Sequence, residues 1–262
     1  MRTLIVVPTH NEEANIAEIL DRVRTTVPQA DVLVVDDAST DGTRRLVTER
    51  AADDPQLRLE ARADKRGLGD AYLHAFRIGL AEGYDALVEI DADMSHDPAV
   101  LPTMLDLADR GIALVIGSRY VPGGSVVGWP RRRTWLSRWG NRYAAIMLGL
   151  AVNDATAGYR VYRADTLRRI GIDGVRAGGY GFQVEMTYRV VQAGLGVVEV
   201  PITFRDRVAG TSKMSRAIIT EAFGLVTWWG LVDLVTLRRR RRAYREQLHD
   251  AQTGAQEPTG SS

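Results

Sequence analysis

Residues 85–97 read DALVEIDADMSHD, and this stretch decides which fold the chain adopts. The short apolar run of Leu87, Val88 and Ile90 is typical of a buried strand, and carboxylates follow it at once at Asp91, Asp93 and Asp97. Carboxylates crowded at the end of a buried element repel one another and are poorly solvated, so a cation or hydrogen-bond donors must offset their charge. The stretch therefore predicts a strand that ends at a site for a positive ligand.

Four further apolar runs have strand character, and helical patterns fill most of the gaps between them: residues 4–7, 32–35, 57–59 and 112–116. Continuous apolar strands separated by helices indicate a parallel sheet that is covered on both faces. We therefore predict an α/β fold with a Rossmann-like, mostly parallel sheet. Ligands of such sheets bind beyond the carboxyl ends of the strands. Three polar segments are thus expected to line one crevice: PTHNEE (8–13), DDASTDGT (36–43) and DADMSHDP (91–98).

Composition excludes several classes of protein. The 262 residues are 45% hydrophobic and 26% charged, as in globular proteins, and the net charge of +1 predicts no nucleic-acid partner. The absence of cysteine excludes disulfides, thiolate metal sites and a cysteine nucleophile. Gly67 and Gly69 lack the third glycine and the strand context of a dinucleotide fingerprint, which argues against a nicotinamide-binding protein.

The second half of the chain combines basic and aromatic segments. Helices are predicted near residues 132–150 and 182–192, a strand over 196–203, and a basic, glycine-containing loop over 205–213. From residue 216 a helical pattern contains Trp228 and Trp229 and ends in five arginines, 238–242. An interfacial helix beside a polybasic patch, in peripheral contact with an anionic membrane, is the favoured interpretation. A helix packed on the protein's own core is the alternative.

Five segments, in this order, together resemble one known family: VVPTHNE (6–12), VVDDASTDGT (34–43), DADMSHDP (91–98), GSRY (117–120) and FRDRVAGTSK (204–213). They are similar to family-2 inverting glycosyltransferases of the GT-A fold, in particular to the polyprenyl-phosphate (dolichyl-phosphate) mannose synthases. The resemblance implies a GT-A domain over residues 1–215, followed by an amphipathic or membrane-interfacial helix with a polybasic end (216–248). Residues 249–262 are predicted to be a disordered tail.

The resemblance implies transfer of mannose from GDP-mannose to polyprenyl phosphate with inversion, at the cytoplasmic face of the cell membrane. The amino terminus lacks a signal-peptide pattern, in agreement with a peripheral, cytoplasmic location. Two other functions remain open: glucose transfer from UDP-glucose to the same lipid, and an inactive lipid-phosphate-binding module. A membrane protein that anchors the chain is a further partner that the sequence leaves undetermined.

The same resemblance assigns residues to the donor. Pro8, His10, Glu12, Val35 and Asp37 match positions that hold the nucleotide. Asp91, Ala92 and Asp93 match the segment along the diphosphate, with Asp93 as a direct ligand and Asp91 as a second carboxylate for Mg²⁺ or Mn²⁺. Ser95 stands where the family often has a glutamine that binds the metal. A serine hydroxyl is a shorter and weaker ligand, so we expect lower metal affinity.

The remaining assignments concern the acceptor and the leaving group. Arg119, Arg133 and Ser137 match positions that capture the lipid phosphate, and arginine presents a donor fork suited to phosphate oxygens. Arg207 and Lys213 match residues that grip the donor diphosphate, and they join Asp91 and Asp93 as predicted catalytic residues.

No general base is expected, because a phosphate monoester with a second pKa of about 6 is mostly ionised at neutral pH. Asp154 and Glu185 are candidates for positioning the sugar, although structural roles are favoured for both.

Overall fold

A computed structural model describes residues 1–206, 223–232 and 234. Four predicted features lie wholly or mainly outside the described residues: Arg207, Lys213, the arginine run at 238–242 and the tail at 249–262.

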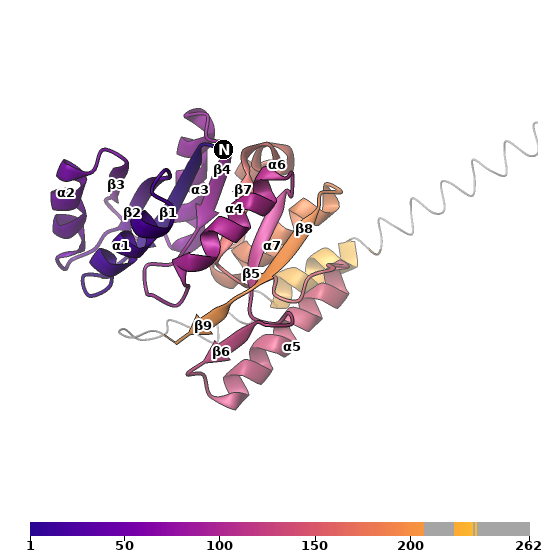
Figure 1. Cartoon of the computed structure of the whole chain (residues 1–262). Helices are drawn as coiled ribbons and strands as arrows, with labels where there is room; N and C mark the ends of the chain where they lie inside the picture. Colours follow the sequence, from indigo (N-terminus) through magenta and orange to yellow (C-terminus); the bar gives the residue numbers. More distant parts are fainter. Residues whose placement is uncertain (207–222, 233, 235–262) are drawn as a thin grey trace, which may run out of the picture.

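Seven strands form the central sheet, in the spatial order β3-β2-β1-β4-β7-β5-β8 (Figure 1). Their bounds are β1 Thr3–Thr9, β2 Asp31–Asp37, β3 Leu57–Arg62, β4 Ala86–Glu89, β5 Leu114–Ser118, β7 Arg160–Arg163 and β8 Val197–Pro201. Among the strands of this sheet that the structure describes, β7 alone runs antiparallel to its neighbours, and the other pairs are parallel. The predicted mostly parallel α/β sheet is confirmed.

Helices cover both faces of this sheet. One face carries α1 (Ile16–Thr26), α2 (Thr43–Asp53) and α4 (Leu101–Asp109), and the other carries α3 (Leu68–Ala81), α6 (Ala164–Ile170) and α7 (Gly179–Gln192). Side chains of β1 alternate between the two cores, with Leu4 and Val6 in one and Ile5 and Val7 in the other. Burial on both faces explains why this strand is apolar throughout.

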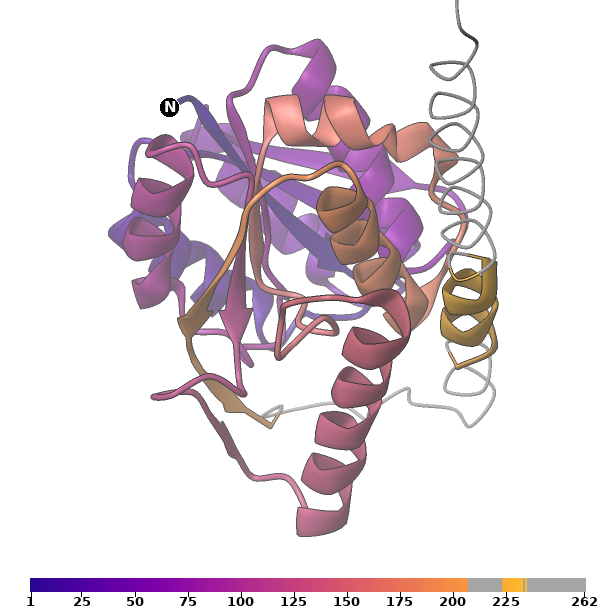
Figure 2. The ribbon, with the colours of Figure 1, turned by 90° about the vertical axis from the view of Figure 1, so that its right-hand side faces the viewer.

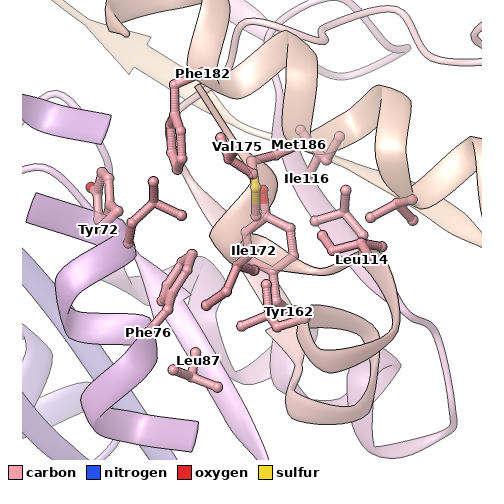
Figure 3. Packing of buried hydrophobic residues seen from close by; sticks show 14 of the residues in the cluster. Tyr72, Phe76, Leu87, Leu114, Ile116, Tyr162, Ile172, Val175, Phe182 and Met186 are labelled. Atoms are coloured by element: carbon pink, nitrogen blue, oxygen red, sulfur yellow. The ribbon is translucent and has the colours of Figure 1, made fainter. Parts of the chain in front are cut away.

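Aromatic rings fill the core between α3, α7 and β7 (Figure 3). Tyr72 stacks on Phe182 with centroids 6.2 Å apart, and Phe76 meets the edge of Tyr162 at 5.6 Å. These contacts fix α7 against α3, and residues near the start of both helices line a cavity at the carboxyl ends of the strands.

The sequence did not predict β7, α6 or a small second sheet. In that sheet β6 (Ser125–Val127) pairs in parallel with β9 (Thr203–Arg205). The expected strand at 196–203 is therefore two strands: β8 ends at Pro201, which has no N–H to donate, and the chain then leaves the central sheet.

Residues 223–232 form a helix beside α5 (Arg131–Leu148), and Figure 2 shows the two along one side of the molecule. The helix packs through Phe223, whose ring centroid lies 5.3 Å from that of Trp139, and through Thr227, whose hydroxyl lies 2.6 Å from that of Tyr143. A side chain at Gly230 would collide with the carbonyl of Met147, so the backbones approach closely here. Within the described ranges, no helix has the length and apolar character needed to span a bilayer.

Candidate active site

A cavity of about 440 Å³ lies at the carboxyl ends of β1, β2 and β4. It brings together nine of the residues predicted from sequence: Pro8, His10, Glu12, Asp37, Asp91, Ala92, Asp93, Arg119 and Arg133. Val35 lies instead in the hydrophobic core and is fully buried. Ser95 is also buried, outside the cavity lining that the described residues form.

The three loops at this edge share an uncommon backbone conformation. Within the described residues, positive φ angles at non-glycine positions occur at Asn11 (59°), Ala38 (59°) and Met94 (62°), one in each predicted polar segment. Such residues cost free energy and persist where the surrounding structure fixes them, frequently at ligand sites. The bend at Met94 lets the Ser95 N–H donate to Asp93 Oδ1 at 3.0 Å.

Asp37 and His10 shape the part of the cavity predicted to hold the nucleotide. Asp37 Oδ2 accepts hydrogen bonds from the backbone N–H groups of Arg66 (3.0 Å) and Gly67 (2.8 Å). Its Oδ1 lies 3.4 Å from Nε of Arg62. His10 Nδ1 is 2.7 Å from the carbonyl oxygen of Asp37, and because a carbonyl only accepts, Nδ1 carries the proton. Asp37 thus anchors the loop before α3 as well as lining the cavity.

Asp91 and Asp93 form the acidic part of the site. Tyr72 donates its O–H to Asp91 Oδ1 at 3.3 Å. Burial, followed by the charge of Asp91, raises the pKa of Tyr72 well above its usual range, so the phenol stays a donor at neutral pH. Asp93 is only 4% exposed. Two lining carboxylates with hard oxygen atoms suit a divalent cation.

A cation at this point needs additional ligands. In the described part of the chain, no group of three carboxylate, imidazole or thiol side chains is placed to hold a metal ion. The buried Ser95 Oγ has no hydrogen-bond partner among those residues. Diphosphate oxygens and water would complete the coordination of an ion at Asp91 and Asp93, which is the pattern expected for Mg²⁺ or Mn²⁺ beside a nucleotide.

A second, narrow cavity of about 110 Å³ adjoins the first and contains Ser137. The two cavities share Arg119, Trp129, Arg133 and Thr156. The remaining walls of the narrow cavity are mostly apolar, and come from α5, α7 and the helix at 223–232: Leu136, Tyr143, Ala144, Val184, Phe223 and Val226. A polar cavity and an apolar one therefore meet at two arginines.

Arg133, where the two cavities meet, has hydrogen-bond partners within the described ranges for only part of its guanidinium group. Its Nη1 lies 3.3 Å from Asp206 Oδ1, and its guanidinium carbon is 3.9 Å from the ring centroid of Trp129. Its Nε is buried and has no hydrogen-bond partner among the described residues. A buried donor without a partner is costly, so an anion that accepts from it would be stabilised here.

Arg119 has an additional structural role that the sequence did not reveal. Its Nε and Nη2 form two hydrogen bonds with the carboxylate of Asp154, at 2.7 and 2.6 Å, and Asp154 is fully buried. Asp154 therefore holds Arg119, and Glu185 binds backbone N–H groups of Arg176 and Ala177 together with Arg189. The structural roles favoured for both acids agree with these contacts.

Sequence reasoning missed Glu89, Gln183 and Arg160. Glu89 lies fully buried on β4 and accepts a 2.7 Å hydrogen bond from Gln183 Nε2. Burial raises the pKa of Glu89 to about 8, although the positive charge of Arg160 acts to lower it. A signal was present, since Glu89 is the one charged residue within the apolar run 86–90.

This shift predicts a pH dependence of stability. Glutamate is ionised in the unfolded chain above its ordinary pKa of 4.5, whereas folded Glu89 keeps its proton up to about pH 8. The folded state therefore binds more protons and loses stability as pH rises. Between pH 7 and pH 9 the loss is expected to be about 1.4 kcal/mol, measured by urea unfolding in EDTA. Glu89→Gln should lack this component, and an identical pH dependence in both proteins would contradict the prediction.

Comparison with known proteins identifies the class. Residues 4–171 match the family model "Glycosyl transferase family 2". The chain belongs to this family, and the family resemblance of its motifs is confirmed.

Two curated relatives are much more similar to the chain than the solved structures are. An undecaprenyl-phosphate mannosyltransferase of Micrococcus luteus is 54% identical over 231 residues, which cover 88% of this chain and 95% of that protein. A polyprenol monophosphomannose synthase of Mycolicibacterium smegmatis is 49% identical, covering 88% and 87%.

Solved structures share the fold. Glucosyl-3-phosphoglycerate synthase from Mycobacterium tuberculosis has a TM-score of 0.65 at 22% identity, with 85% of this chain and 79% of that one covered. A mannosyltransferase from Pyrobaculum calidifontis, in complex with GDP-mannose and Mn²⁺, has a TM-score of 0.57 at 21% identity, covering 90% and 64%. The predicted GT-A fold is confirmed.

Proposed function

We propose that this chain transfers mannose from GDP-mannose to polyprenyl phosphate, with inversion at the anomeric carbon. The observation that carries the proposal is the junction of a polar, acidic cavity with an apolar one at Arg119 and Arg133. A sugar nucleotide suits the first cavity, a lipid suits the second, and a phosphate suits the arginines between them. The names of the two curated relatives favour mannose over glucose and an active enzyme over an inactive module.

The donor would occupy the larger cavity. Its nucleotide lies against His10 and Asp37, and its diphosphate lies along Asp91 and Asp93, which hold Mg²⁺ or Mn²⁺. When bound, the cation offsets negative charge on the departing diphosphate. Arg207 and Lys213, outside the described residues, are proposed to add positive charge to the same group.

The acceptor phosphate would lie at Arg133, Arg119 and Ser137. The unpartnered Nε of Arg133 donates to it, and Ser137 Oγ, which accepts from the Tyr120 O–H at 2.7 Å, has its own hydrogen left to donate. Asp154 keeps the Arg119 guanidinium fixed, which reduces the entropy lost on binding. The ionised phosphate oxygen attacks the anomeric carbon without a base, and the residues supply alignment.

The direct test is transfer of label from GDP-mannose to a short polyprenyl phosphate in the presence of Mn²⁺. A butanol-extractable, acid-labile labelled product is expected. UDP-glucose replaces the donor in a parallel reaction. Efficient transfer from UDP-glucose with none from GDP-mannose would assign the glucose alternative, and binding of the lipid phosphate without transfer from either donor would assign the inactive module.

An exposed apolar face accompanies the narrow cavity and suits peripheral contact with a membrane. Along α5 and the neighbouring helix it consists of Trp135, Leu136, Trp139, Ile146, Trp228, Leu231, Val232 and Leu234. Four exposed arginines of α5 are positioned for anionic lipid: Arg131, Arg132, Arg138 and Arg142. The helix at 223–232 thus packs on the protein with one side and exposes apolar residues with the other. Attachment at the cytoplasmic membrane face is part of the proposal.

Replacing both Trp135 and Trp139 with alanine tests this face. Trp135 is 66% exposed and Trp139 is 45% exposed, so a bilayer would bury much of both rings. Partitioning onto vesicles containing phosphatidylglycerol is expected to fall at least about ten-fold. Cosedimentation measures it, with GDP binding in solution as the control for folding. Unchanged partitioning would rule out this face as the contact.

A further inference from the structure

We propose that Gln183 binds a hydroxyl group of the donor hexose through its side-chain carbonyl, and that Glu89 positions Gln183 for this contact. The inference rests on the proposed function in one respect, that the larger cavity holds a nucleotide sugar. The inference adds a residue that binds the hexose, whereas the residues of the proposed function bind the nucleotide, the diphosphate and the acceptor.

Gln183 is buried and yet lines the larger cavity. Its Nε2 donates to Glu89, while its Oε1 is buried without a hydrogen-bond partner among the described residues. An amide oxygen left unsatisfied in a buried position is destabilising, and a ligand O–H would satisfy it. The hydroxyl groups of the hexose are donors of this kind, as are the ribose hydroxyls and the N–H groups of the base, so the position of Gln183 decides between them.

The position of Gln183 relative to Asp91 supports a sugar rather than a nucleotide contact. Gly158 lies between them, since a Cβ at Gly158 would be 3.6 Å from Asp91 Oδ2 and 3.9 Å from Gln183 Nε2. The glycine leaves that space open. A diphosphate along Asp91 and Asp93 therefore places its hexose next to the Gln183 amide, while Asp37 faces the nucleotide.

Two buried groups hold Gln183 in place, one at its backbone and one at its side chain. Arg160, on β7 in register with Glu89 of β4, donates from Nη1 to the backbone carbonyl of Gln183 and to Thr187, each at 3.0 Å. Glu89 Oε2 accepts from the amide nitrogen at 2.7 Å. Since the amide nitrogen donates to Glu89, the amide oxygen is the group that is left for the ligand.

The test compares affinities for a nucleotide sugar and for its nucleoside diphosphate by calorimetry. Gln183→Met is expected to weaken binding of GDP-mannose about ten-fold and to leave GDP binding within two-fold, because GDP has no hexose. UDP-glucose and UDP are measured in parallel, so the comparison holds for whichever donor the wild type binds. Wild-type turnover, measured separately, reports on the proposed function, whereas this ratio reports on Gln183.

GDP-mannose analogues that each lack one hydroxyl of the mannose identify which hydroxyl Gln183 binds. One deoxy analogue should bind wild type about ten-fold more weakly than GDP-mannose, and Gln183→Met should bind the two equally. Glu89→Leu should show the same hexose-dependent loss, and Glu89→Gln, which keeps an acceptor for Nε2, should restore affinity. Gln192→Met is the matched control, at an exposed position of the same helix.

Three results would overturn the inference: equal losses for GDP and GDP-mannose in Gln183→Met, no loss for either, or wild-type affinity that is indifferent to every deoxy position. If Gln183→Met does not fold, Gln183→Asn, whose amide is too short to reach both Glu89 and the ligand, should show the same selective loss.

Discussion

Asp93→Ala is expected to lower the turnover number by about 10²–10³-fold or more, while the protein remains folded. Asp93 lines the cavity, is almost fully buried, and is the residue proposed to hold the cation against the donor diphosphate. Removing one group that stabilises developing charge in a water-excluded site costs this much in characterised enzymes. Initial rates with labelled GDP-mannose measure the effect, and binding of Mn²⁺ in the presence of GDP should be lost in parallel.

Asp97→Ala is the matched control for this prediction, since it removes a carboxylate from the same segment. Asp97 is exposed, and its Oδ1 accepts from the Ala99 N–H as a cap of the short helix Pro98–Val100. A loss of stability of about 1 kcal/mol with turnover unchanged is expected. If Asp93→Ala kept wild-type turnover, the proposal that Asp93 binds a catalytic metal ion would be wrong.

Asp154→Asn should destabilise the protein by about 3–5 kcal/mol, the largest effect on stability that we expect from one substitution. The fully buried carboxylate is the charge partner of Arg119, which is itself only 6% exposed. Asp154→Asn leaves the positive charge of Arg119 buried without the counter-charge of Asp154. The free energy lost is far larger than the contribution of an exposed ion pair. Urea unfolding gives the difference, and the acceptor concentration for half-maximal rate should also rise because Arg119 is no longer held.

Asp106→Asn provides the comparison. Asp106 pairs with Arg110 at 2.8 Å on the surface of α4, and both side chains are more than half exposed. Exposed pairs contribute at most about 1 kcal/mol. If the two substitutions have equally small effects, Asp154 does not fix Arg119 as the structure indicates.

The parts of the fold that the sequence predicted are those with long apolar runs. The runs at 4–7 and 32–35 lie in β1 and β2, and the run at 86–90 contains β4 and Ile90 after it. Burial on both faces favours apolar residues there. No such signal marks β7, because its four residues, RVYR, begin and end with arginine. Arg160 is tolerated in the core because carbonyls and hydroxyls accept from its guanidinium, some from its own segment and some from α7. A local sequence pattern cannot contain the contacts with α7.

A similar limit applies to the site. Carboxylates directly after strands predicted that Asp37, Asp91 and Asp93 would share a crevice, because parallel strands end at one edge, and the cavity contains all three. Gln183 was not predicted, because it enters from a helix and its relation to Glu89, 94 residues earlier, depends on tertiary packing. The functional roles of the predicted residues, including Arg207 and Lys213, remain predictions.

The insertion of β7 between β4 and β5 has a consequence for synthesis on the ribosome. β5 has two neighbours in the sheet, β7 and β8, and both are translated after it. All five residues of β5 are buried in the finished protein, so the nascent chain exposes an unpaired, aggregation-prone strand until residue 163 has emerged. About 45 residues separate the end of β5 from the end of β7. At about 5–20 residues per second, this interval lasts roughly 2–9 seconds, the period in which a chaperone would be most useful to this chain.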